Sequence, residues 1–152
     1  MAGELVLICP PLGCPTGEVY RVFDERAGER PGARLRADDV GRLASEAVRT
    51  GEIDDAGMFN DLEGAAMAVR PELAEVKKAV EELLGERLGG RRVHVSGSGS
   101  TLFVFGGEDV ARAINGAAGG ALPAGTRAIA TRLAGADCAA GTDGAAGAKR
   151  DG

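Results

Sequence analysis

The sequence predicts an α+β fold in which helices cover one face of an antiparallel sheet. A continuous apolar run at residues 5–8, closed by Pro10 and Pro11, is typical of a buried strand. Several segments with helical spacing follow it. Two strand-like segments, 92–96 and 101–105, are then joined by a short glycine-rich loop. The order of strand, helices, two strands, helix and strand favours helices gathered on one side of a sheet.

The first helix is expected to begin at Thr16, after a turn rich in Gly and Pro. Thr16 is a residue type that caps helix N-termini, and Glu18 lies in the first turn, where the helix dipole favours an anion. Val19, Tyr20 and Phe23 recur at helical spacing. We expect this helix to stop near Gly28 and a loop to follow it.

Three more helices are expected before the second strand. Apolar residues at i, i+3, i+4, i+7 and i+8 from Val40 predict one over residues 38–51. Asn60 and Glu63 have capping-box spacing, with Asn60 accepting from a first-turn N–H and Glu63 reaching back, so a short helix should run to about Ala68. Pro71 suits a first helical position, and the stripe that follows predicts the third helix, to residue 84.

The second half supplies the remaining strands. His94 alternates with Val93 and Val95, so its side chain should point away from theirs, to solvent or to a cross-strand neighbour. A helix is expected over residues 108–117 and a last strand over 126–133. The tail is different: 11 of the 18 residues from 135 to 152 are Gly or Ala, too few apolar groups to offset the entropy of ordering. We therefore expect one domain, residues 1–134, and a disordered tail, 135–152.

Composition excludes several classes of function. The net charge of −5 and the 3% of aromatic residues speak against a nucleic-acid partner, which requires a basic face or stacking rings. One histidine, and a Cys9–Cys14 spacing unlike that of metal ligands, predict no metal site and free, reduced thiols. Without an apolar run near 18 residues or a basic leader, we expect a cytoplasmic protein with no membrane partner.

The glycine-rich loop is the strongest candidate for binding. Glycines let a backbone turn tightly, and successive N–H groups in such a turn form a concave site for anions. A Walker A loop is excluded, because that loop requires a lysine and a following helix. On its own, a short Gly/Ser loop between two strands is more often a simple turn than a binding site. Its residues are Ser96, Gly97, Ser98, Gly99 and Ser100.

The order of these motifs resembles a known family. A strand, Pro-Thr-x-x-x-aromatic at residues 15–20, Asn-Asp-Leu-Glu at 60–63, a Pro-initiated helix and Ser-Gly-Ser-Gly-Ser-Thr-x-Phe at 96–103 follow one another. The sequence over residues 5–133 thereby resembles the C-terminal half of 4-diphosphocytidyl-2-C-methylerythritol kinases. The glycine-rich motif alone would indicate only the wider GHMP kinase superfamily.

The resemblance implies a GHMP kinase C-terminal domain-like fold and a role in phosphorylating a hydroxyl group with ATP and Mg²⁺, in the non-mevalonate route to isoprenoids. Tyr20 matches the aromatic ring that stacks on the cytosine of the substrate in that family, and Thr16 matches a threonine near the substrate. Residues 96–100 match the loop that lines the phosphate region. These residues would bind substrate; none of them is a catalytic residue.

One departure from the family is large. The ATP loop, catalytic aspartate and lysine belong to the N-terminal half of such kinases, and nothing in this sequence matches them. By family the protein is a kinase, but this chain alone is expected to be inactive and to need a separate N-terminal half, or to form a homodimer. Two alternatives stay open: a non-catalytic interaction module, and half of a homoserine- or mevalonate-type kinase with a cytidine-free substrate.

Overall fold

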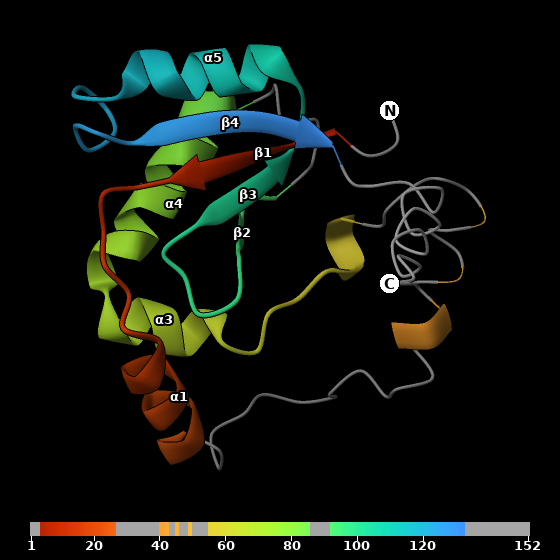
Figure 1. Cartoon of the computed structure of the whole chain (residues 1–152), viewed down its shortest axis with the longest axis vertical. Helices are drawn as coiled ribbons and strands as arrows, with labels where there is room; N and C mark the ends of the chain where they lie inside the picture. Colours follow the sequence, from red (N-terminus) through yellow and green to blue (C-terminus); the bar gives the residue numbers. More distant parts are fainter. Residues whose placement is uncertain are drawn as a thin grey trace, which may run out of the picture.

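The structure is a computed structural model that describes residues 4–26, 40–42, 45, 49, 55–85 and 92–132. In chain order its elements are β1 (Glu4–Cys9), α1 (Thr16–Glu25), the 3-10 turn η1 (Asp55–Gly57), α3 (Glu63–Val69), α4 (Pro71–Leu84), β2 (His94–Val95), β3 (Leu102–Phe105), α5 (Glu108–Ala117) and β4 (Arg127–Arg132). Figure 1 shows them arranged around a central sheet.

The sheet has the strand order β2-β3-β1-β4, and every neighbouring pair is antiparallel. Val6 of β1 lies opposite Val104 of β3 and Ala130 of β4. The first strand in sequence is therefore central, flanked by strands from the far end of the chain. This pairing brings the segment after β1 close to the connection between β2 and β3.

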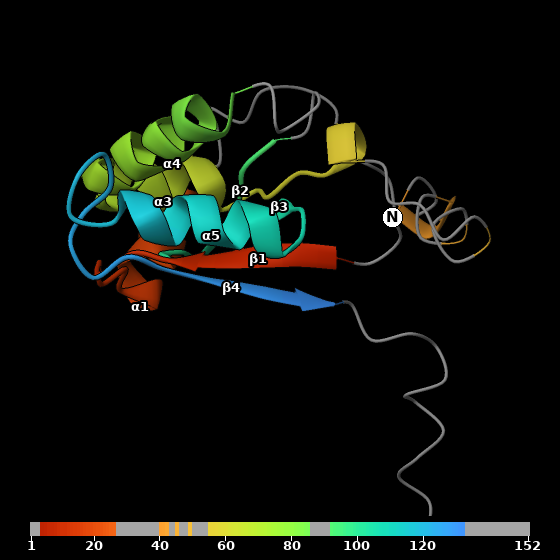
Figure 2. The same cartoon turned by 90° about the horizontal axis from the view of Figure 1, so that it is seen from above.

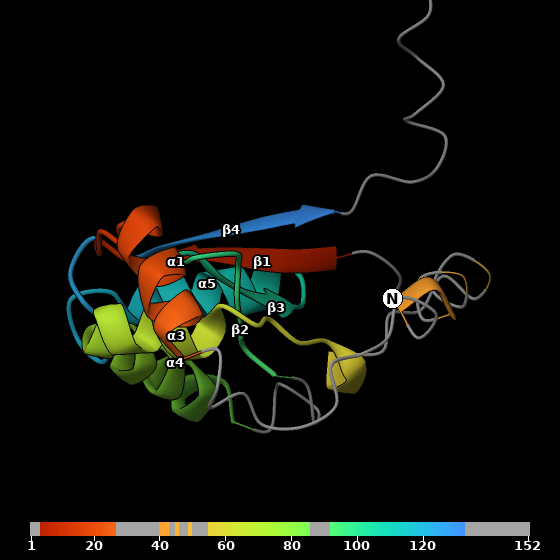
Figure 3. The same ribbon diagram turned by 90° about the horizontal axis from the view of Figure 1, so that it is seen from below.

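Helices cover one face of this sheet, as expected. Figures 2 and 3 show α3, α4 and α5 on the same side, and α1 near the end where β1 leaves the sheet. Residues in strands alternate between two faces, and those on the helix side are buried. The core consists mainly of Val6, Ile8, Leu102 and Val104 from the sheet and Leu73, Val76, Val80, Leu84, Val110 and Ile114 from the helices.

Most predicted elements are confirmed with small shifts in their ends. β1, α4 with Pro71 in its first turn, β3 and α5 lie where the sequence placed them. α1 ends earlier than expected, at Glu25, and β2 has only two residues. Of the helix predicted over 38–51, residues 40–42, 45 and 49 are described and are helical. Gly28, Leu133 and the predicted tail lie outside the described residues.

No described helix combines the length and apolarity that crossing a membrane requires.

Candidate functional site

The glycine-rich loop (residues 96–100) is a tight, internally bonded turn between β2 and β3. The Ser96 N–H donates to Thr101 O at 2.9 Å, and the Gly99 N–H donates to Ser96 O at 3.0 Å. Gly97 and Gly99 have positive φ angles of 55° and 79°, a region that residues with a Cβ rarely adopt. A Cβ on Gly99 would also lie 3.1 Å from Leu73 Cδ2 of α4. The glycine at 99 is thus required both by conformation and by space.

The first turn of α1 contacts this loop. Thr16 Oγ1 and Ser98 Oγ are 3.0 Å apart, a hydrogen-bond distance between residues distant in sequence. The expected capping role of Thr16 is wrong: the cap is Pro15, which makes no side-chain cap bond, and Thr16 is the first helical residue. The hydroxyl of Thr16 faces the glycine-rich loop, because this loop lies where the helix begins.

Asn60 ties a third segment to the same loop. Its Nδ2 donates to Val95 O at 2.9 Å and to Gly97 O at 2.7 Å, while its Oδ1 accepts from the Leu62 N–H at 3.0 Å. The predicted capping box is not formed: the N-cap of α3 is Leu62, which makes no side-chain cap bond, and the Asn60 side chain accepts from Leu62 rather than from a helical N–H. Glu63 does not reach back, because it pairs with Lys77 of α4 at 2.5 Å. Asn60 therefore fixes the loop as well as the start of α3.

The connection from β1 to α1 is held at two further points. Ser100 Oγ donates to Leu12 O at 2.5 Å, and Arg70 Nε donates to Gly13 O at 2.6 Å. Cys14 lies in this connection beside the glycine-rich loop, with Sγ 3.5 Å from where a Gly99 Cβ would be. Burial raises the pKa of the Cys14 thiol, an effect that Arg70 opposes and Glu18 reinforces. Neutral thiol is therefore the favoured form there.

Tyr20 lies one helical turn after Thr16, so both residues share a face of α1. Its side chain is 50% exposed rather than packed in the core. Phe59, just before Asn60, is also exposed, at 55%. Phe59 belongs to none of the sequence motifs, and the one signal that marks it is an aromatic residue directly before Asn60.

The site contains hydroxyl groups, main-chain N–H groups and the exposed ring of Tyr20, all from α1 and the glycine-rich loop. Such donors suit an anion, and the ring suits a flat group. Among the described residues, no cluster of three His, Cys, Asp or Glu side chains could hold a metal ion. All predicted binding residues, Thr16, Tyr20 and 96–100, therefore lie in one region, and none of them is a carboxylate or an imidazole.

His94 does not belong to this group of residues. Its side chain points away from those of its valine neighbours, as predicted, but it is only 7% exposed. The ring stacks on Phe103 of β3 with centroids 5.0 Å apart, and Nε2 lies 2.5 Å from Asp55 Oδ1. The cross-strand alternative is confirmed and the solvent-facing one is wrong.

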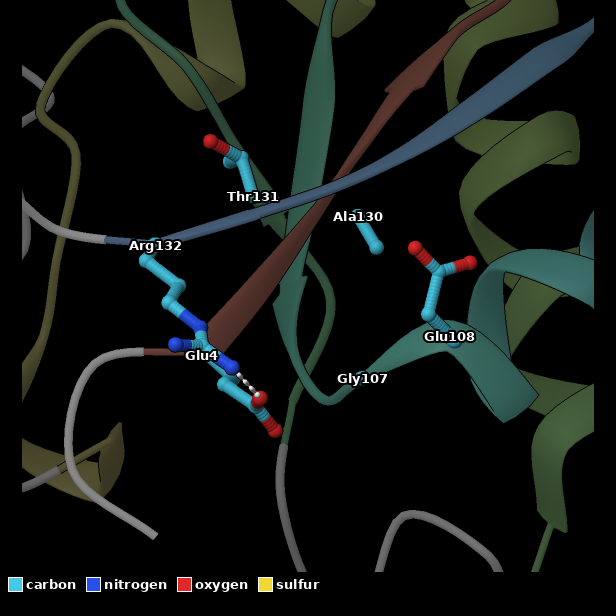
Figure 4. A pocket seen from close by; sticks show the side chains of 6 residues that line it. All are labelled: Glu4, Gly107, Glu108, Ala130, Thr131 and Arg132. Atoms are coloured by element: carbon cyan, nitrogen blue, oxygen red, sulfur yellow. Dashed lines mark hydrogen bonds and ion pairs between the residues drawn. The ribbon is translucent and has the colours of Figure 1, made fainter.

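A small pocket of about 120 Å³ lies elsewhere, at the start of β1 and the end of β4 (Figure 4). Arg132 and Glu4 form an ion pair across it at 3.2 Å. The length of β1, roughly 3.4 Å per residue, separates this pocket from the motif residues. No predicted binding residue is among its lining residues, which are Glu4, Gly107, Glu108, Ala130, Thr131 and Arg132.

Comparison with known proteins gives consistent matches. A 4-diphosphocytidyl-2-C-methyl-D-erythritol kinase from Nocardioides sp. is 40% identical over 111 residues, which are 72% of this chain and 35% of that kinase. The kinase of the same name from Pelotomaculum thermopropionicum is 35% identical over 101 residues, 65% of this chain and 31% of its own length. The chloroplastic kinase of rice is 34% identical over 110 residues, 69% of this chain and 24% of its own length.

A solved structure agrees with these relatives. The crystal structure of a 4-(cytidine 5'-diphospho)-2C-methyl-D-erythritol kinase superposes with a TM-score of 0.55 and 33% identity, covering 86% of this chain and 42% of that one. No protein-family model matches the chain. The chain spans about a third of the length of the first curated relatives it matches. It is thus homologous to a portion of the 4-diphosphocytidyl-2-C-methyl-D-erythritol kinases and shares the α+β fold of that portion.

Proposed function

We propose that this chain is the C-terminal, substrate-side part of an ATP-dependent kinase that phosphorylates a hydroxyl group of a cytidine-containing substrate. The observation that carries the proposal is the 3.0 Å contact between Thr16 and Ser98. It joins the Pro-Thr motif of α1 to the glycine-rich loop, the two motifs on which the resemblance most depends. The names of the relatives supply the reaction and the substrate class.

In this proposal, each segment of the site has one task. Tyr20 stacks on the cytosine, since a half-exposed ring offers a flat apolar surface at little entropic cost. Thr16 and the Ser98 hydroxyl orient the polar part of the substrate. The main-chain N–H groups of Gly97, Ser98 and Ser100 stabilise negative charge on the phosphate groups, since those of Ser96 and Gly99 are bonded within the turn.

ATP and Mg²⁺ belong to the other half of the kinase. We therefore assign no residue of this chain to Mg²⁺. Phosphoryl transfer depends on holding the triphosphate in line with the acceptor, so the chain by itself should bind substrate without turning it over.

The test is calorimetric titration of the chain with cytidine 5'-diphosphate. Saturable binding is expected, weakened about tenfold or more by Tyr20→Ala, because base stacking contributes about 1–3 kcal/mol. Ile129→Ala is the matched control: Ile129 is 52% exposed, close to the 50% of Tyr20, but lies on β4. A lack of affinity for cytidine nucleotides, even with the N-terminal half of a relative added, would overturn the proposal.

Ligand choice tests the alternative of another GHMP kinase half. A homoserine- or mevalonate-type domain would bind small alcohols that carry no nucleotide and would ignore cytidine. Stronger binding of homoserine or mevalonate than of cytidine diphosphate would favour that assignment.

The sheet face opposite the helices favours a second candidate, a non-catalytic interaction module. Cross-strand pairing puts Leu7 beside Phe103 and Ile129 on this face, and Ile129 is largely exposed. A partner half or a second copy would bury this apolar row. Sedimentation equilibrium separates the kinase part from the interaction module, because the module should form a dimer or a complex. A chain that stays monomeric and binds cytidine diphosphate would count against the interaction module.

The cytoplasmic location is also part of the proposal for this chain. The names of two plant relatives, from rice and peppermint, specify the chloroplast.

A further inference from the structure

The segment from Asp55 to Asn60 lies along the outer edge of β2 and is anchored there at both ends. At its start, Asp55 Oδ2 accepts from the Arg92 N–H at 2.6 Å, and Asp55 Oδ1 lies 2.5 Å from His94 Nε2. At its end, Asn60 donates to Val95 O and Gly97 O. β2 is an edge strand of the sheet, so these side chains bond main-chain groups that a neighbouring strand would otherwise pair.

The Asp55–His94 pair is sheltered and firmly oriented. The side chains are 13% and 9% exposed, so solvent screens their interaction less than it screens a surface ion pair. The His94 ring is stacked on Phe103 at an interplanar angle of 23°, and Phe103 in turn contacts Phe105 edge-on, with centroids 6.1 Å apart. Packing thus fixes the imidazole from one side while the carboxylate fixes it from the other.

Nothing in the proposed kinase part uses this pair directly. The residues assigned to the ligand are Thr16, Tyr20 and the glycine-rich loop, whereas the Asp55 carboxylate bonds Arg92 and His94. Asp55 is, however, connected to the loop by two routes. One runs along the backbone to Asn60, which donates to Gly97 O. The other runs through His94 in β2, two residues before Ser96.

We propose that Asp55 and His94 are a positioning pair that holds the glycine-rich loop in its ligand-binding conformation. The pair anchors the start of the 55–60 segment. The bonds from Asn60 to the loop therefore do not have to offset the entropy cost of ordering the whole segment. When the first anchor is lost, conformations in which Asn60 releases Val95 O and Gly97 O gain population. The inference rests on the proposed function only for its effect on ligand affinity.

The test compares two side-chain anchors at opposite edges of the sheet. Asp55→Ala removes the anchor at β2. Asn115→Ala removes a matched anchor at β4, where Asn115 donates to Ala128 O at 2.9 Å and accepts from the Ala128 N–H at 2.8 Å. Amide hydrogen exchange is measured at Gly99, whose N–H bonds Ser96 O, and at Ala128.

Relative to global unfolding, Asp55→Ala should speed amide exchange at Gly99 about tenfold or more and leave exchange at Ala128 unchanged. Asn115→Ala should speed exchange at Ala128 and leave exchange at Gly99 unchanged. Asp55→Asn should restore slow exchange at Gly99, because its amide oxygen can still accept from the Arg92 N–H. If Asp55→Ala does not fold, His94→Leu replaces it, since leucine preserves apolar packing on Phe103 while removing the bond to Asp55.

Affinity for cytidine 5'-diphosphate gives the second readout, with an expected loss of about tenfold for Asp55→Ala and none for Asn115→Ala. If both variants lose stability equally and Gly99 exchange follows global unfolding alone, the pair is a structural anchor and the proposal is overturned. If the wild-type chain does not bind cytidine diphosphate, the proposed function fails, while the exchange at Gly99 still decides whether the pair positions the loop.

Discussion

Thr16 Oγ1 lies 3.0 Å from Ser98 Oγ, although the two residues are 82 positions apart in the chain. The contact exists because the pairing of β1 with β3 brings the segment after β1 to the end of the sheet where β3 begins. It is the direct physical link between the two motifs to which a substrate-binding role is assigned.

Thr16→Val should weaken binding of cytidine diphosphate about tenfold while changing the free energy of unfolding by less than about 1 kcal/mol, because an exposed hydrogen bond contributes little to stability. Valine has nearly the shape of threonine but no hydroxyl. Titration calorimetry and urea denaturation measure the two quantities. Thr16→Ser keeps the hydroxyl and should bind like the wild type; equal affinity of Thr16→Val and the wild type would contradict the assigned role.

Gly99→Ala should destabilise the fold by about 2 kcal/mol, more than Gly97→Ala, for which about 1 kcal/mol is expected. Both residues have positive φ angles, so both substitutions add backbone strain. Only at Gly99 would the new Cβ also press on Leu73, at 3.1 Å, whereas the space at Gly97 is open. Chemical denaturation of the two variants measures these losses in the free energy of unfolding. Equal losses would show that Leu73 moves away from the new Cβ at no cost in stability.

Asn60→Asp should be more damaging than its small change in shape suggests. The carboxylate still accepts from the Leu62 N–H, but it cannot donate to Val95 O and Gly97 O, which it would now face as an anion. A loss of about 2–3 kcal/mol is expected from the two unpaired carbonyls and the repulsion. Thermal unfolding measures it. Asn60→Ala, which loses the same bonds without adding charge, should lose less.

Cys14 should react slowly with iodoacetamide near neutral pH. Burial, reinforced by Glu18, raises the pKa of its thiol, so the reactive thiolate is scarce until the pH passes above the ordinary thiol range. Glu18→Gln should lower this pKa and speed alkylation at a given pH. Peptide mapping follows the rate at Cys14. Rates that are equal in the wild type and Glu18→Gln would contradict the electrostatic part of the explanation.

The same shift has a consequence for stability. Because the folded-state pKa of Cys14 lies above the unfolded one, the folded chain holds its proton more tightly. The contribution to stability is fully present below the ordinary thiol pKa and is lost as the pH rises through the higher, folded-state value. Over this alkaline range, the denaturation midpoint should therefore fall less steeply with rising pH in Cys14→Ser than in the wild type.

Local patterns predicted the elements whose signals are strong within a few residues. Pro71 and the stripe from Leu73 to Leu84 place α4 correctly, since one face of that helix is buried. The same reasoning assigned Thr16 and Glu63 to helix caps, and both assignments were wrong. Their side chains are used by tertiary contacts instead, Thr16 by Ser98 and Glu63 by Lys77, and no local pattern reveals such partners.

Features that depend on long-range pairing could not be predicted. The strand order β2-β3-β1-β4 and the shortness of β2 follow from which segments meet in the folded chain. The anchor between Asp55 and His94 joins residues 39 positions apart, and neither residue has a local motif that indicates the other. The motif residues, in contrast, were found by their order along the chain, which a family resemblance preserves.

The measurement that tests the central claim most directly is an NMR titration of the ¹⁵N-labelled chain with cytidine 5'-diphosphate. The account predicts saturable shifts at the amides of Gly17, Tyr20, Gly97, Ser98 and Gly99, with no shifts along β4. Shifts confined to the pocket at Glu4 and Arg132, or no shifts in a folded chain, would contradict it.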